Sequence, residues 1–361
     1  MKIITRIAAA AMALSMLLSS AALADMTTIE GKLKTDITIA SSYAENSVED
    51  GISPLTGLPS SGEAYTPIMI VIDNAEDAYP HWGLLDSDII VQIPNESGGA
   101  TKLLAIFGDK YPEQAGGNRS GRASMAPIAA AFDAAFVYAG YATPESNVSN
   151  LNNVFINMKM KGKGKLFDAL GNATWKERVK FVAEPHNLSI HVNELHNKLI
   201  SDGAQFEVRA FAFADSIRTE GEDAYTIQIL HYGSDPTNRS NPASAATYNY
   251  DEETDLYTRT SLAGLNVDRD SGEAITFSNI IVIRTQIMSD KGYIYLKNNL
   301  VGSGVAEIFQ NGKYVQGAWS RSEALSRLVL IDSDGSELKL QPGRTMLVVT
   351  NDVTSVSYGM E

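Results

Sequence analysis

Cysteine is absent from the 361-residue sequence, and basic residues are scarce. The first absence excludes disulfide bonds, thiolate metal sites and a cysteine nucleophile, and it leads us to expect no lipid-anchored N-terminal cysteine. Only 29 Lys and Arg stand against 43 Asp and Glu, which gives a formal net charge of −14. Binding to nucleic acid depends on Lys and Arg that neutralise phosphates. We therefore expect no nucleic-acid partner and interpret the acidity as an aid to solubility.

Long apolar runs are missing after the first 24 residues. Residues 1–24 combine two early positive charges, an apolar run and an Ala-Leu-Ala ending. This pattern is typical of a secretory signal peptide, here cleaved after Ala24. No later stretch reaches the roughly 18 apolar residues that a membrane-spanning helix needs. We expect a secreted, extracytoplasmic protein without a membrane span.

The common catalytic and nucleotide-binding motifs are missing as well. The sequence contains no GxSxG, HExxH or GxxxxGK[ST] pattern, and no SxxK string in a strand–turn–helix context. These patterns place a nucleophile, a zinc ion or a phosphate in a defined strand and helix context. Their absence favours binding over catalysis, and we expect no cofactor and no metal.

Local patterns divide the rest of the chain into three parts and predict an α+β fold. Residues 25–51 are polar without a sustained hydrophobic period, and we expect a flexible polar spacer. Residues 52–204 alternate strand and helix signals, typical of an N-terminal α/β domain with a mixed sheet and flanking helices. Residues 205–361 contain short strands at close intervals, which predict a mostly antiparallel β domain. Asn311-Gly312 is the strongest hairpin signal there.

Within residues 52–204 the apolar runs predict individual elements. Strands are expected over 67–74, 87–96 and 101–109. A helix is expected over 122–134, where Pro127 either kinks it or lies in its first turn. An amphipathic helix is expected over 189–203.

Two arginines occur in the glycine-rich stretch "GGNRSGRASMAP". Arg119 and Arg122 would share one face of a helix that begins near Ser120, where free N–H groups favour an anion. The planar guanidinium binds two oxygens of a phosphate or carboxylate at once. Two interpretations remain open: the arginines bind an anion, or they pair with acids of the same domain.

Polar side chains end two of the predicted strands. Asp73 and Asn74 close one, and Glu96 closes another. Ligands of open α/β sheets collect at the carboxyl ends of strands. If the two strands are parallel neighbours, these side chains meet the arginine loop. They would then act in acid/base chemistry, or they would orient the arginines and cap turns.

A third candidate is the loop "PHN". His186 and Asn187 follow Pro185 and would reach the same sheet end to complete the rim of the site. The alternative is a buried loop histidine that fixes backbone carbonyls.

The order of these motifs resembles a known family. The resemblance rests on "SPLTGLP", "IMIVIDN", "ESGGATKLLAIF", "NRSGRASMAPIAAAFDAAFVYAG", "PHNL" and "GSGVAEIFQNGKYVQGAW". They look like the YerB-type bacterial envelope proteins, the DUF3048 family, over nearly all of residues 52–350. The resemblance implies an extracytoplasmic, often lipid-anchored protein with an α/β N-terminal part, a β-rich C-terminal part and no established activity. The chain departs from the family in lacking the lipid-attachment cysteine and in carrying Lys102 where arginine is usual.

Two functional hypotheses follow. The first is a secreted, non-catalytic binding or regulatory protein of the cell envelope, whose partner is an anionic envelope ligand or a protein of cell-wall synthesis. The second is an envelope enzyme acting on a phosphate or glycan bond, with Arg119 and Arg122 stabilising charge and Asp73 or Glu96 as base. A carboxylate free of the arginines would favour the enzyme. A mutual lock between Asp73 and an arginine would favour binding or structure.

Overall fold

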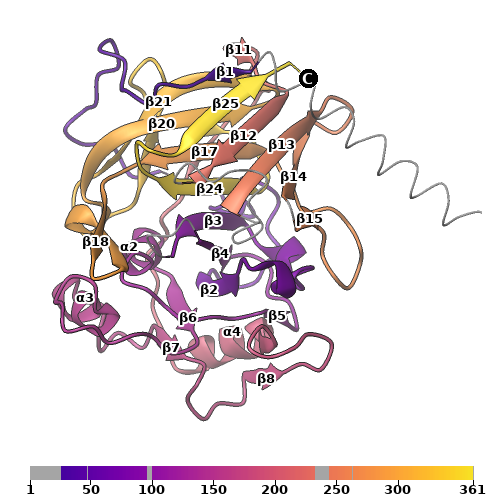
Figure 1. Cartoon of the computed structure of the whole chain (residues 1–361), viewed down its shortest axis with the longest axis vertical. Helices are drawn as coiled ribbons and strands as arrows, with labels where there is room; N and C mark the ends of the chain where they lie inside the picture. Colours follow the sequence, from indigo (N-terminus) through magenta and orange to yellow (C-terminus); the bar gives the residue numbers. More distant parts are fainter. Residues whose placement is uncertain (1–25, 47, 96–99, 232–243, 262, 361) are drawn as a thin grey trace, which may run out of the picture.

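A mixed sheet of eleven strands runs through the computed structural model, which describes residues 26–46, 48–95, 100–231, 244–261 and 263–360 (Figure 1). Its strands are β2 (Ile68–Asp73), β3 (Ile89–Pro94), β4 (Thr101–Phe107), β6 (Ala135–Tyr138), β7 (Leu166–Asp168), β11 (Glu222–Asp223), β17 (Asn279–Arg284), β20 (Gly302–Gln310), β21 (Lys313–Arg321), β22 (Val329–Ile331) and β24 (Thr345–Thr350). The order is β11-β21-β20-β17-β24-β3-β4-β2-β6-β7, with β22 beside β21. Because β24 pairs with both β17 and β3, the two halves of the chain share this central sheet.

Further sheets and the helices surround the central sheet. An antiparallel seven-stranded sheet, at the top of Figure 1, comprises β1 (Thr27–Thr28), β12 (Thr226–Leu230), β13 (Ala245–Asp251), β14 (Leu256–Ser261), β15 (Gly264–Leu265), β16 (Thr276–Phe277) and β25 (Ser355–Gly359). The smaller sheets are β5 (Ala115–Gly116), β9 (Leu188–Ile190) and β8 (Lys176–Arg178); β10 (Ala212–Phe213) and β23 (Lys339–Leu340); and β18 (Ile287–Asp290) and β19 (Tyr293–Leu296). The α-helices are α2 (Ala126–Ala131), α3 (Leu151–Asn157) and α4 (Val192–Ser201), and the 3₁₀ helices are η2 (Glu76–Ala78), η3 (Leu84–Asp86) and η6 (Lys297–Leu300). None of the helices in the described ranges is long and apolar enough to cross a membrane.

Side chains of β2 alternate between two hydrophobic cores. Met69 and Val71 belong to a core that includes residues of α2 and α3. Ile70 and Ile72 belong to a second core, with residues of α4 and of the seven-stranded sheet. Because both faces of the central sheet are covered, its strands are continuous apolar runs. Asp73 ends β2 on the side of Met69 and Val71.

Most expected elements of the first half are present, with shifted ends. The strands expected over 67–74, 87–96 and 101–109 are β2, β3 and β4. The helix expected over 122–134 is shorter, because α2 begins at Ala126, and Pro127 lies in its first turn. The segment 189–203 contains the end of β9 followed by α4.

The hairpin expected at Asn311-Gly312 joins β20 to β21. Both residues have positive φ, 51° and 66°, as a two-residue type I′ turn requires. The two strands pair in register from Gln310 and Lys313 outward. The hairpin prediction is confirmed.

The described part of the expected spacer packs on the folded body. β1 pairs with β25, and the Lys34 N–H donates to Oε1 of Gln316 at 2.8 Å. Ile37 is buried in a small cluster with Ala318 and Ile331. This differs from the flexible spacer expected from polar composition, because backbone pairing and a few scattered apolar contacts leave no hydrophobic period. The expected signal peptide, residues 1–24, lies outside the described residues.

Candidate functional site

The centre of the site is Asp73, the last residue of β2. Asp73 lies directly opposite Lys102 of β4 in the antiparallel register, so their side chains stand on the same face of the sheet. Nζ of Lys102 lies 2.5 Å from Oδ1 of Asp73. The carboxylate is almost fully buried, whereas the Lys102 side chain is 14% exposed. A strand pairing therefore builds the first ion pair of the site.

Two further side chains hold the other oxygen of Asp73. Nε of Arg119 lies 2.9 Å from Oδ2, and Nδ1 of His186 donates to the same oxygen at 2.7 Å. Arg119 also donates from Nη1 to the carbonyl of Pro185 at 3.3 Å, and its own N–H donates to the carbonyl of Val71. The arginine loop, the "PHN" loop and β2 thus meet at one carboxylate.

Glycine allows these two loops to approach so closely. The carbonyl of Gly117 accepts the Asp73 N–H at 2.9 Å, and the next N–H, of Asn118, donates to the Leu188 carbonyl at 2.7 Å. A Cβ on Gly117 would collide with the carbonyl oxygen of His186. The close backbone approach that glycine permits here therefore serves the packing of two protein loops.

Electrostatics keep Asp73 ionised. Burial raises the pKa of Asp73, but the charge and hydrogen bond of Lys102, the charge of Arg119 and the hydrogen bond of His186 outweigh it and lower the pKa to about 2. Burial lowers the pKa of Lys102, and together with the charges of Arg119 and Arg122 it outweighs the charge and hydrogen bond of Asp73, which raise it. The site therefore crowds positive charges around one carboxylate.

Sequence reasoning missed His81 as a part of this site. Its Nε2 donates to the backbone carbonyl of Asp73 at 2.6 Å, and burial lowers its pKa to about 4, which leaves the ring uncharged at neutral pH. His81 is fully buried and packs beside the Tyr79 ring. In the sequence, only its position eight residues after Asp73 indicated that His81 could belong to this site.

Asn74 and Asn187 bind neighbouring protein groups. Asn74 donates to Oγ1 of Thr101 at 2.7 Å and accepts from the Tyr79 hydroxyl at 2.6 Å, which fastens the loop after β2 to β4. Asn187 accepts from Nη1 of Arg178 at 2.7 Å. Both asparagines therefore shape the loops around Asp73.

The arginine loop does not have the helical form expected of it. Because α2 begins at Ala126, Arg119 and Arg122 both precede the helix and do not share a helical face. Arg122 donates from Nη1 to the Gly121 carbonyl at 3.0 Å and has a further interaction. Ser120 is half-buried, and its hydroxyl makes no hydrogen bond with the described residues.

The strands that end near Asp73 and Glu96 are not neighbours, which the meeting of these acids would have required. β2 and β3 are parallel to each other but are not neighbours, since β4 lies between them and pairs with both. The lysine of β4 thus occupies the place next to Asp73 where an acid of the β3 end was expected. Glu96 itself lies outside the described residues.

The arrangement offers hydrogen-bond donors to an anion. Among the described residues, Asp73 is the one partner of the Lys102 ammonium, and Nη2 of Arg119 has none. The Arg119 side chain is 30% exposed, so its free edge is accessible to solvent. No group of three or more acidic or histidine side chains in the described ranges is placed to hold a metal ion.

Comparison with known proteins places the chain in a family. Residues 55–205 match the N-terminal domain and residues 237–347 the C-terminal domain of "Protein of unknown function (DUF3048)". "Putative lipoprotein YerB" of Bacillus subtilis (strain 168) is 27% identical over 316 residues, which cover 84% of this chain and 88% of that protein. The crystal structure of YerB protein from Bacillus subtilis has the same fold, with a TM-score of 0.69 at 24% identity over 84% of this chain and 99% of that chain. The protein therefore belongs to the DUF3048 family.

Proposed function

We propose that this protein is a secreted binding or regulatory protein of the bacterial cell envelope, which binds an anionic envelope ligand through Lys102 and Arg119 and carries out no chemistry of its own. The main support is the excess of positive charge at Asp73. Two cations and a histidine share this single buried carboxylate, in a chain whose net charge is −14. An anionic group beside them would restore the charge balance.

The donors suit a phosphate or carboxylate group. The Lys102 ammonium has three N–H donors and the Arg119 guanidinium five, and Asp73 occupies only part of each set. Hydrogen bonds in which both partners are charged are about twice as strong as neutral ones. Partial burial strengthens them further, because the local dielectric constant is lower than that of water.

The state of Asp73 favours binding over the enzymatic alternative. A general base works best when its pKa lies near the working pH, and the pKa of Asp73 is lowered to about 2. Both of its oxygens also accept from neighbouring side chains. Asp73 is therefore a counter-ion that positions Lys102 and Arg119.

The envelope location is inferred from the N-terminus and from the family. Residues 1–24 have the pattern of a signal peptide, and the Bacillus relative is named as a lipoprotein. Because cysteine is absent, we infer a secreted protein without the lipid anchor. A protein of cell-wall synthesis is the second kind of partner that this location allows.

Isothermal titration calorimetry with inorganic phosphate at low ionic strength tests the site. Wild type is compared with Arg119→Gln, which removes the charge but keeps a polar side chain. Arg218→Gln is the matched control, because Arg218 is likewise paired with an aspartate, Asp332, outside the site. Near-ultraviolet circular dichroism shows whether each variant is folded.

We expect phosphate to bind wild type and Arg218→Gln equally and to bind Arg119→Gln at least tenfold more weakly. If wild type binds no phosphate, or if a folded Arg119→Gln binds it as tightly as wild type, the proposed anion site is wrong. If Arg119→Gln is unfolded, Lys102→Gln replaces it with the same expectation.

A further inference from the structure

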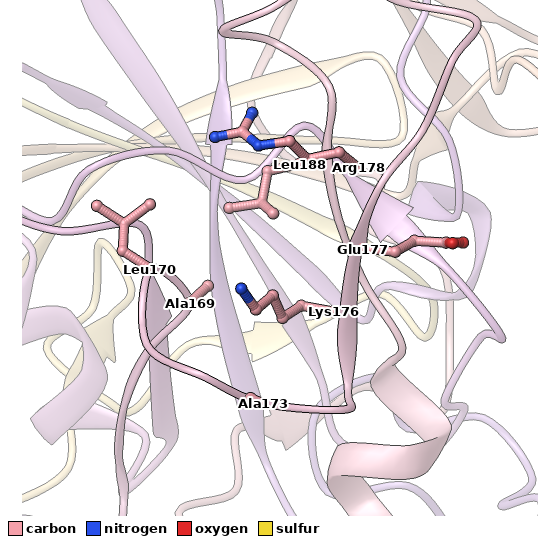
Figure 2. A pocket seen from close by; sticks show the side chains of 7 residues that line it. All are labelled: Ala169, Leu170, Ala173, Lys176, Glu177, Arg178 and Leu188. Atoms are coloured by element: carbon pink, nitrogen blue, oxygen red, sulfur yellow. The ribbon is translucent and has the colours of Figure 1, made fainter.

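Figure 2 shows a surface hollow lined by residues of β8 and of the segment 169–173. The hollow has a volume of about 360 Å³ and lies between β8 and the segment 169–173, which directly follows β7, the edge strand of the central sheet. Its lining combines two cations and one acid with apolar residues: Lys176, Arg178, Glu177, Ala169, Leu170, Ala173 and Leu188. Such a lining suits an anionic group attached to an uncharged carbon unit.

The cations face the hollow because side chains alternate along β8. Lys176 and Arg178 project to one side of the strand, whereas Glu177 points away (Figure 2). Glu177 is occupied elsewhere, since it accepts from Gln114 and lies 3.4 Å from Nε2 of His191. Within the described residues the Lys176 ammonium has no ion pair or hydrogen bond. The hollow therefore has a cation available for a ligand.

One loop separates the hollow from the Asp73 site. Arg119 donates to the Pro185 carbonyl on one side of this loop, and Arg178 donates to Oδ1 of Asn187 on the other. Leu188, at the end of the loop, lines the hollow and accepts the Asn118 N–H next to Arg119. The two cationic sites thus border the same short segment.

We infer that the hollow is a second subsite for the ligand that binds at Lys102 and Arg119, and that this ligand is a linear chain with repeated anionic groups separated by uncharged carbon units. The inference rests on the proposed function. One anionic group binds at Arg119, the carbon unit packs on the exposed Leu170 side chain, and a second anionic group binds at Lys176 and Arg178. A single phosphate occupies only one subsite.

Two linked anionic groups bind more tightly than one, because the second binds at a high effective concentration. The test therefore compares glycerol phosphate with a short oligomer of poly(glycerol phosphate) by calorimetry on the full mature chain. The variant is Lys176→Gln, and the control is Lys291→Gln, an exposed lysine in the turn between β18 and β19. Both variants remove the same charge.

We expect the oligomer to bind wild type and Lys291→Gln at least tenfold more tightly than the monomer does. In Lys176→Gln this advantage should fall to threefold or less, while monomer affinity stays unchanged. If glycerol phosphate binds in a way that requires Arg119 but the oligomer binds no more tightly, the second subsite is refuted and the proposed function stands. Failure of both ligands to bind wild type would overturn the proposed function itself.

Discussion

Replacement of Asp73 by asparagine tests the charge arrangement at its centre. Asp73→Asn keeps the size of the side chain and removes the counter-charge from Lys102 and Arg119. Removing one partner of a fully buried ion pair costs about 3–5 kcal/mol. Because Lys102 and Arg119 are 14% and 30% exposed, water screens part of this penalty. We expect a loss of about 2–3 kcal/mol in the free energy of unfolding at neutral pH.

The same effect has a pH signature. The pKa of Asp73 is lowered from its ordinary value of 3.8 to about 2, which corresponds to about 2 kcal/mol at 1.36 kcal/mol per pKa unit. A lowered carboxyl pKa stabilises the folded state above pH 4, and this stabilisation is lost as the pH falls through the folded value. The difference between wild type and Asp73→Asn should therefore shrink by about 2 kcal/mol between pH 5 and pH 2.

Urea unfolding at several pH values, followed by tryptophan fluorescence, measures both quantities. Asp270→Asn is the control, because Asp270 is an exposed aspartate paired with Arg269. This substitution should change the free energy of unfolding by less than about 0.5 kcal/mol. The charge arrangement would be refuted if Asp73→Asn were as stable as this control at neutral pH. It would also be refuted if the difference from wild type did not change with pH.

Three further substitutions test other buried features of the fold. Burial raises the pKa of Asp88 from 3.8 to about 7. The free energy of unfolding of wild type should therefore fall by up to about 4 kcal/mol as the pH rises from 4 to 7. Urea unfolding of Asp88→Asn should not show this fall. Glu307→Gln leaves the buried Arg284 without its counter-charge and should cost about 3–5 kcal/mol in urea unfolding; a cost below 1 kcal/mol would contradict the pairing. Gly117→Ala should cost about 1–3 kcal/mol because its Cβ meets a backbone carbonyl, and an unchanged midpoint would show that the two loops are not in close contact.

Local patterns were enough to place the strands and the hairpin. Continuous apolar runs predicted β2, β3 and β4, because strands covered on both faces have no polar side to interrupt them. Asn311-Gly312 predicted its turn because both positions need positive φ. Each of these signals lies within a few residues of the feature it specifies. The packing of residues 26–46 left no such signal, since it depends on pairing with β25 at the far end of the chain.

Sequence reasoning also selected Asp73, Arg119 and His186, which the structure brings together at one carboxylate. It selected them because they are charged or titratable residues at a strand end or in a loop, and these properties can be identified from the sequence without knowledge of tertiary contacts. The lysine opposite Asp73 was noticed only as a departure from the family. Its role depends on the register between β2 and β4, which no local pattern determines.

Strand order is what favours the proposed binding function over the enzymatic alternative. Carboxylates at the ends of two adjacent parallel strands would repel each other, which raises the pKa of one and prepares it for acid/base chemistry. In this fold β4 lies between β2 and β3 and brings Lys102 opposite Asp73. The same aspartate then loses its affinity for a proton and becomes the counter-ion of two cations, whose remaining donors point to an anionic ligand. One strand inserted between two others thus changes a candidate base into a counter-ion, which is the role that the proposed binding site requires of it.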